Sequence, residues 1–143
     1  MTAKEYFKQA FTIHRLIKAK ESRIQDLRDM LEHVGGMGQQ IKVQSSPKSD
    51  PMAELVATLV DLIVECQMDY ARLLTIQREI QQEIERVERA DLRLILFERY
   101  VNLKTWEDIA ISIGYTVRHV TRLHGQALIA TKRCPVLSAK KVV

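Results

Sequence analysis

The amino-acid sequence predicts an all-α protein, in which a long antiparallel helical hairpin precedes a C-terminal unit of three short helices. Residues that favour helices, chiefly Glu, Lys, Arg, Leu, Ile and Gln, dominate the 143 residues, and only 5 Gly and 3 Pro interrupt them. Apolar residues recur at helical spacing in two long stretches and then in three shorter ones. This order of stretches indicates the hairpin first and the three-helix unit second.

The first long helix is expected from residue 3 to about residue 34. Its inward positions alternate in spacing between four and three, which is a heptad pattern: Tyr6, Ala10, Ile13, Ile17, Lys20, Ile24, Leu27, Leu31 and Val34. A seam of this length needs a second helix against it. Gly35, Gly36 and Gly38 are expected to stop the helix, and the composition of residues 35–50 is typical of a mobile linker.

The second long helix is expected over residues 51–89. Asp50 is a suitable N-cap, and Pro51 suits the first helical position. The apolar stripe of this helix is broad in its first half, wider than one neighbouring helix can cover. We therefore assign residues 1–89 to the hairpin and expect two hairpins to meet in a homodimer. Acidic side chains near its end are expected to be solvated: Glu79, Glu83, Glu85 and Glu88.

The first of the three short helices is expected after Asp91, which is a candidate cap. Its apolar face comprises Leu92, Ile95, Leu96 and Tyr100. The break before the next helix is expected at residues 102–104.

Residues 105–123 carry the most specific pattern in the chain. Thr105 can cap a short helix whose apolar positions are Trp106, Ile109, Ala110 and Ile113. Gly114 can take the left-handed conformation of a sharp turn, and Thr116 can cap a further helix. The inward residues of that helix are expected to be Val120, Leu123, Ala127 and Leu128. This combination predicts a C-terminal trihelical helix-turn-helix domain over residues 90–133; the alternative is a helical corner that serves only packing.

Charge is distributed unevenly along the chain. The net charge is +4, yet residues 52–90 sum to −4 and residues 91–143 to +5. From Ser112 to the end there is no Asp or Glu, and residues 134–143 form a basic tail. A stretch with one sign of charge attracts phosphate, which predicts salt-dependent binding of double-stranded DNA. For Lys140 and Lys141 a solvated tail is an equally good interpretation.

Motifs for catalysis or for cofactors are not found in the sequence. It has no Gly-rich phosphate loop, nucleophile elbow or metalloprotease signature, so we expect neither an enzyme nor a cofactor. Cys66 and Cys134 are expected to be plain thiols, and the five-residue spacing of His119 and His124 does not suit a helical metal site. No apolar run is long enough for a membrane span, and the N-terminus lacks a signal-peptide core, so a cytoplasmic protein is expected.

The segment LRLILFERYVNLKTWEDIAISIGYTVRHVTRLHGQAL, residues 92–128, resembles the region-4-like domain of phage-encoded transcription regulators from phages of Gram-positive bacteria, the late-gene activators of the ArpU and RinA type. Nearly the whole chain is similar to a family of phage proteins with an MTAKEYF-like start and a central VQSSP segment. The shared C-terminal positions are Trp106, Ile109, Ala110, Gly114, Tyr115, Arg118, His119, Val120, Arg122, Leu123, His124, Gly125, Ala127 and Leu128. The segment also resembles the sigma-factor region that reads the promoter −35 element, although no part of the chain matches the regions that melt DNA.

The resemblance implies a sequence-specific DNA-binding transcriptional regulator in the cytoplasm of a bacterial host, with RNA polymerase as a further candidate partner. Side chains facing away from the helix core are expected to reach base edges: Thr116, Val117, Arg118, Thr121 and Arg122. His119 is expected to touch a phosphate or a base, and Lys104, Lys132 and Arg133 to touch phosphates. Two alternatives stay open. One is a protein-interaction module that docks through the hairpin, and the other is a small-terminase-like DNA-packaging adaptor, in which the DNA-binding unit usually comes first.

Overall fold

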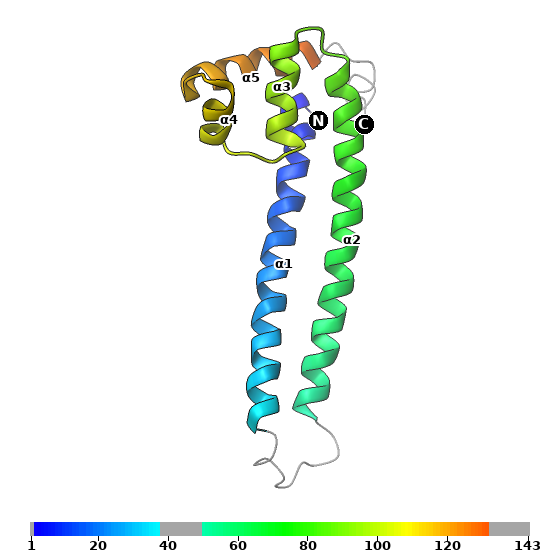
Figure 1. The fold of residues 1–143 in the computed structure, drawn as a ribbon. Coiled ribbons are helices and arrows are strands. Elements are labelled where there is room, and N and C mark those ends of the chain that lie inside the picture. Colours follow the sequence, from blue (N-terminus) through cyan, green and yellow to red (C-terminus); the bar gives the residue numbers. More distant parts are fainter. Residues whose placement is uncertain (1, 38–49, 132–143) are drawn as a thin grey trace. The chain divides into compact units, whose positions relative to one another are not determined.

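The computed structural model describes residues 2–37 and 50–131, and within these ranges it contains five α-helices and no strand (Figure 1). The predicted all-α class is therefore confirmed. The helices are α1 (Ala3–Met37), α2 (Pro51–Glu85), α3 (Ala90–Tyr100), α4 (Trp106–Ile113) and α5 (Val117–Thr131). None of these five is both long enough and apolar enough to cross a membrane.

The chain divides into two compact units. Unit 1 comprises Met1–His14 and Arg72–Val143, and unit 2 comprises Arg15–Ala71. Each unit thus takes a segment of α1 and a segment of α2, and the described part of unit 1 also contains α3, α4 and α5.

Unit 2 is held together by an apolar seam and by a buried ion pair. Its most buried apolar side chains are Ile17, Ile24, Leu27 and Cys66, three of which belong to the predicted heptad. Lys20 occupies a heptad position because its Nζ lies 2.5 Å from Oδ2 of buried Asp69 and 3.6 Å from Oε2 of Glu65. The hydrogen bond to Asp69 raises the pKa of Lys20. Cys66 is a free thiol whose pKa is raised by burial, and Cys134 lies outside the described residues.

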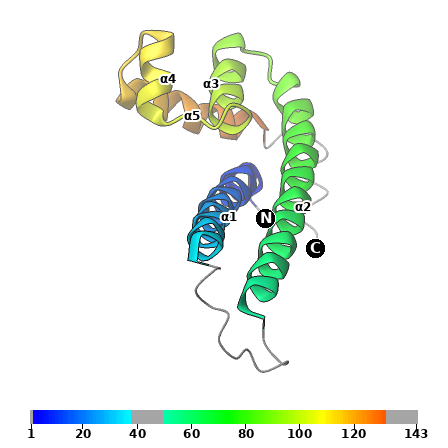
Figure 2. The ribbon, with the colours of Figure 1, turned by 60° about the horizontal axis from the view of Figure 1, so that its bottom comes forward.

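Unit 1 has its core around α3. The predicted inner face of this helix is buried throughout: Leu92, Ile95, Leu96 and Tyr100. Figure 2 shows α5 lying across α3 and α4, and both of these helices contact it. The N-terminal segment of α1 adds Phe7, which is fully buried although it stands outside the predicted heptad. Its ring centroid lies 5.1 Å from that of Tyr100, which explains the burial.

Several helix ends differ from those expected. Helix α1 continues through Gly35 and Gly36 and ends at Met37, so these glycines do not stop it. The remaining linker residues, 38–49, lie outside the described residues. Helix α2 ends at Glu85 instead of residue 89. There the N–H of Arg86 and the N–H of Val87 each donate to a carbonyl three residues earlier, which tightens the last turn.

Two caps were predicted for the helices that follow the linker, and one of them is wrong. Asp50 caps α2 as predicted, because its Oδ1 accepts from the N–H of Met52 at 3.0 Å. Asp91 does not cap α3. The chain is extended at Arg89, with ψ 125°, so the helix starts at Ala90 and Asp91 falls inside its first turn. The Asp91 carboxylate pairs with the Arg89 guanidinium, and the two atoms lie 2.7 Å apart.

The acidic end of α2 is only partly solvated. Glu83 is 2% exposed, with Oε1 3.4 Å from Nη1 of Arg86, so the expectation that it faces solvent is wrong. Glu79 accepts a hydrogen bond from the Tyr6 hydroxyl at 3.2 Å. Glu79 is nevertheless exposed, and Glu85 and Glu88 are exposed too, as expected.

Candidate nucleic-acid interface

The turn between α4 and α5 is built from the local signals that the sequence predicts. Thr105 caps α4, and its Oγ1 accepts from the N–H of Asp108 at 3.2 Å. Gly114 ends the helix with φ +80°, a conformation that costs glycine little, and its N–H donates to the Ala110 carbonyl. Thr116 then caps α5, because its Oγ1 accepts from the N–H of His119 at 3.1 Å.

The inner face of α5 holds the helix against α3 and α4. Val120, Leu123 and Ala127 are buried as predicted, whereas Leu128 is half-buried. Ala110 is buried in α4, consistent with the close approach expected there. Thr131 is also fully buried, which apolar periodicity could not indicate because threonine is polar.

His124 belongs to this core, because it follows Val120 by four residues and so lies on the inner face of α5. Its Nε2 lies 2.7 Å from the Tyr100 hydroxyl, and the Trp106 ring packs edge-on at 4.7 Å between centroids. Burial, together with the charges of Arg99 and Lys4, lowers the pKa of His124 to about 4. Burial also raises the pKa of Tyr100 to about 12. At neutral pH a protonated Tyr100 hydroxyl and an uncharged imidazole therefore share this hydrogen bond.

Arg99 joins the first helical segment to this cluster. Its guanidinium carbon lies 4.2 Å from the ring centroid of Phe11 and 4.1 Å from that of Trp106. A cation between two aromatic faces is attracted by both rings. Its Nη1 also donates to the Lys104 carbonyl at 2.8 Å. Trp106 is half-buried and contacts both Arg99 and His124, so it lies at the edge of the core, as its apolar position in the predicted helix indicates.

The outer face of α5 carries most of the residues predicted to reach DNA. Thr116, Val117, Arg118, Thr121 and Arg122 are exposed. The Thr121 hydroxyl is occupied by its own helix, since it donates to the carbonyls of Val117 and Arg118 at 3.1 and 3.0 Å.

His119 is half-buried and lies between two neighbours on the α5 surface. Nη2 of Arg122 lies 2.9 Å from Nδ1 of His119, and because a guanidinium can only donate, Nδ1 is the acceptor. The Tyr115 ring packs edge-on against the imidazole, with centroids 4.8 Å apart. His119 thus orients Arg122, a role that sequence spacing of three residues permits but does not reveal.

Three lysine and arginine residues were predicted to touch phosphates, and the structure describes only one of them. Lys104 forms an ion pair with Glu98, so its ammonium group is already engaged in the free protein. The same carboxylate accepts from Nδ2 of Asn102 at 2.9 Å. Lys132 and Arg133 lie outside the described residues. Within the described part of the interface, Arg118 and Arg122 therefore supply the exposed positive charge.

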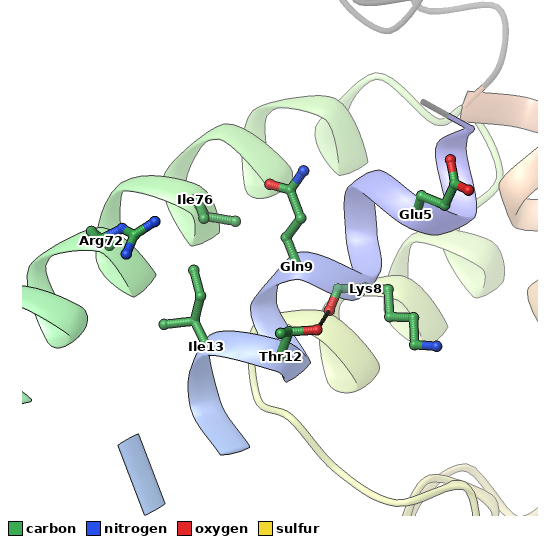
Figure 3. Close-up of a pocket in the computed structure, with 7 residues that line it drawn as sticks. All are labelled: Glu5, Lys8, Gln9, Thr12, Ile13, Arg72 and Ile76. Carbon is green, nitrogen blue, oxygen red and sulfur yellow. Dashed lines mark hydrogen bonds between the residues drawn. The ribbon is translucent and has the colours of Figure 1, made fainter. Parts of the chain in front are cut away.

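Unit 1 has a hollow of about 320 Å³ between its segments of α1 and α2 (Figure 3). It is lined by Glu5, Lys8, Gln9, Thr12, Ile13, Arg72 and Ile76. In Figure 3 Lys8 points away from Arg72, and Glu5 lies at the far end of the hollow from Arg72. Small-molecule sites need polar groups that converge on one ligand, and these do not. In the parts of the chain that the structure describes, no group of three or more His, Cys, Asp and Glu could hold a metal ion.

Neither a protein-family model, nor a curated protein, nor a solved structure matches this chain.

Proposed function

We propose that this chain is a phage-encoded, sequence-specific DNA-binding transcriptional regulator in which α4 and α5 form a helix-turn-helix and α5 enters the major groove. One observation carries the proposal. Arg118 and Arg122 are exposed one turn apart on the outer face of α5, and from Ser112 to Thr131 the chain has no acidic residue. Such a face attracts the DNA backbone, and guanidinium groups also match the O6 and N7 edge of guanine.

In this proposal α3, α4 and α5 are the trihelical DNA-binding domain, and α1 and α2 form a long antiparallel hairpin that brings two copies together as a homodimer. The pairing of α1 with α2 is supported inside each unit by its own contacts. Tyr6 bonds to Glu79 in unit 1, and Lys20 pairs with Asp69 in unit 2. A dimer would place two recognition helices on two half-sites of the DNA.

The residues divide by role according to what each is free to touch. Arg118 and Arg122 are proposed to contact bases, with His119 holding the Arg122 guanidinium in place. Thr116, Val117 and Thr121 offer small apolar groups that suit a thymine methyl. Phosphate contacts are assigned to Lys132, Arg133 and Lys104, and Lys104 must first leave Glu98.

Gly125 supports a close approach of DNA to α5. It lies in the middle of the helix and does not have positive φ, and a Cβ added to it would meet nothing within 4 Å. Glycine inside a helix costs about 1 kcal/mol relative to alanine, so packing in the free protein does not explain this residue. On the helix it falls on the same side as Arg118 and Arg122, where a missing side chain lets another backbone come near.

A second function, docking of a protein such as RNA polymerase, is favoured by one separate observation. Ile111 on α4 is 81% exposed, more than any other large apolar side chain described. An apolar side chain gains little from a phosphate backbone, whereas a protein partner can bury it. This contact is compatible with DNA binding through α5.

A gel-shift titration with random duplex DNA at two salt concentrations tests the proposal. We expect binding at low salt that weakens steeply at high salt, because each neutralised phosphate releases counterions. A variant with both Arg118→Ala and Arg122→Ala should lose this binding, while Arg23→Ala on exposed α1 surface should keep it. Absence of binding at low salt would contradict the proposal that the protein binds DNA. Docking of a protein partner would then be the remaining proposed function.

Recovery of DNA bound to the protein inside the host cell then separates the remaining alternatives. A transcriptional regulator should enrich a few promoter-proximal sites. A small-terminase-like packaging factor should instead enrich the site at which packaging of the phage genome begins. Retention of RNA polymerase by the parent protein, and its loss in Ile111→Lys with DNA binding unchanged, would support the docking contact.

A further inference from the structure

In unit 2, helix α2 carries an exposed apolar ridge on the side away from its buried residues. The ridge consists of residues four positions apart: Met52, Val56, Val60, Val64 and Met68. These five side chains are between 42% and 63% exposed. Residues four apart form a continuous row along a helix, and such rows are the ridges through which helices pack.

The ridge lies on a face without charge. The other residues on the same side of α2 are small or uncharged, namely Ala53, Ala57, Ile63 and Gln67. At 100° per residue the uncharged arc covers about 160° of the helix. The charged residues of this stretch, Glu54, Asp61, Glu65 and Asp69, all fall outside this arc. A solvated helix face normally carries charges, so this one is built to be covered.

The order of side chains along the ridge indicates what covers it. The ridge reads Met, Val, Val, Val, Met, which is symmetric about Val60. In an antiparallel pair of identical helices crossing at Val60, residue 60+n faces residue 60−n of the other copy. Val56 then lies opposite Val64, so that valine opposes valine throughout the centre. Met52 and Met68, each 80° around the helix from Val60, stand at the two edges of the contact.

We infer that two copies of this chain dimerise by packing their α2 helices antiparallel through this face, with the two-fold axis at Val60. A two-fold interface uses one surface patch twice, so the patch must be complementary to itself, and this ridge is. Short valines occupy the centre, where two crossing ridges approach closest. Long and flexible methionines stand at the ends, where crossing helices diverge and leave a wider gap.

A second copy fits this face better than the charged surfaces of the same unit do. The outward residues of α1 include Arg23 and Arg28, whose charges an uncharged ridge could not pair. The identical ridge of another molecule has no such cost. This interface rests on the homodimer of the proposed function, but it lies in unit 2 and needs no DNA. A monomeric protein could still bind DNA, and a dimer could still fail to bind it.

The test is the oligomeric state of the full-length protein without DNA, measured by size-exclusion chromatography with light scattering. The parent is expected to be a dimer. Val60→Lys should raise the dissociation constant at least about a hundredfold, because two ammonium groups then face each other on the axis. Val60 is half exposed and lysine is a good helix former, so this variant should fold, which circular dichroism checks. Thr58→Lys, which introduces the same charge on α2 but off the ridge, should leave the dimer intact.

Disulfide formation tests the antiparallel crossing. In a background of Cys66→Ala and Cys134→Ser, Val60→Cys should cross-link two copies on mild oxidation. Met52→Cys should not, because antiparallel helices place the two copies of residue 52 roughly 24 Å apart, at 1.5 Å per residue.

Three results would overturn the inference. The first is a parent that is monomeric at every concentration, as expected if another segment of the chain or a different protein covers the ridge. The second is a dimer that tolerates Val60→Lys. The third is cross-linking at residue 52 as efficient as at residue 60, which requires parallel helices.

Discussion

The three short helices and the long helical segments of unit 2 use apolar residues in different ways. In α3, α4 and α5 the predicted inner positions are covered by the same chain, and Ile95, Leu96, Ile109 and Val120 are fully buried. In unit 2, α2 buries Cys66 but leaves Val56, Val60 and Val64 about half exposed. The inner face of the first region is therefore covered by its own chain, whereas in the second a continuous apolar row stays exposed. The two proposals follow this division, with DNA binding assigned to the outer face of α5 and dimerisation to the exposed row of α2.

The largest expected effect concerns the core of the three-helix region. Leu96→Ala should lower the free energy of unfolding by about 2–5 kcal/mol, because it leaves a cavity at a fully buried position. The matched change Leu74→Ala, at a leucine that is 55% exposed on α2, should cost less than about 0.5 kcal/mol. Denaturant unfolding of both variants measures the difference. Equal losses of unfolding free energy would show that α2 is covered at Leu74 as completely as α3 is at Leu96.

The next largest effect is a dependence of stability on pH, and it comes from the buried His124. The folded-state pKa of His124 is about 4 and its ordinary value is 6.5, so the unfolded state binds the proton more readily. Stability contributed by His124 should be complete above pH 6.5, fall as pH drops, and level off below pH 4. The total loss is roughly 3 kcal/mol.

This pH effect can be checked by thermal or denaturant unfolding across that window. In His124→Gln the part of the slope due to His124 should vanish, although the variant is less stable throughout. A parent whose slope is unchanged by this substitution would place His124 in solvent. It would also break the contrast between a self-contained core and an open helix face.

The outer faces of α5 and α1 should differ in DNA binding. If Arg118 forks onto a guanine, Arg118→Ala should cost about 1–3 kcal/mol of DNA affinity and relax the preference at one base pair. Arg23→Ala removes the same charge from the exposed surface of α1 and should change neither. Selection of binding sites from a random pool, followed by titration of the best site, measures both. Uniform weakening across all sequences would reduce Arg118 to a phosphate contact.

The smallest expected effect is at Gly125, where one substitution should change protein stability and DNA affinity in opposite directions. Gly125→Ala should raise the free energy of unfolding by about 0.5–1 kcal/mol, because the added Cβ meets nothing within 4 Å. The same variant should bind DNA more weakly, since that methyl group would stand between α5 and the groove. Unfolding and gel-shift titration of one preparation give both numbers. Unchanged or tighter binding would mean that DNA does not approach α5 at Gly125.

What the sequence determined by itself is the local structure. Caps and turns depend on a few neighbouring residues, so Asp50, Thr105, Gly114 and Thr116 perform their predicted roles, although Asp91 does not cap α3 and the glycines 35 and 36 do not stop α1. Helical periodicity likewise identified the buried faces of α3 and α5, because residues three or four apart must share a side. The exposure of Arg118 and Arg122 follows from the same geometry.

Tertiary structure decided everything that depends on a distant partner. Phe7 is buried because the ring of Tyr100, 93 residues later in the chain, packs against it, and the apolar periodicity of α1 alone does not indicate that contact. Lys20 sits in an apolar seam because Asp69 lies 2.5 Å away, a pairing across 49 residues. His124 is part of the core because the Tyr100 hydroxyl, 24 residues earlier, supplies its hydrogen bond. Burial of a polar group requires a partner, and only the folded chain brings that partner within reach.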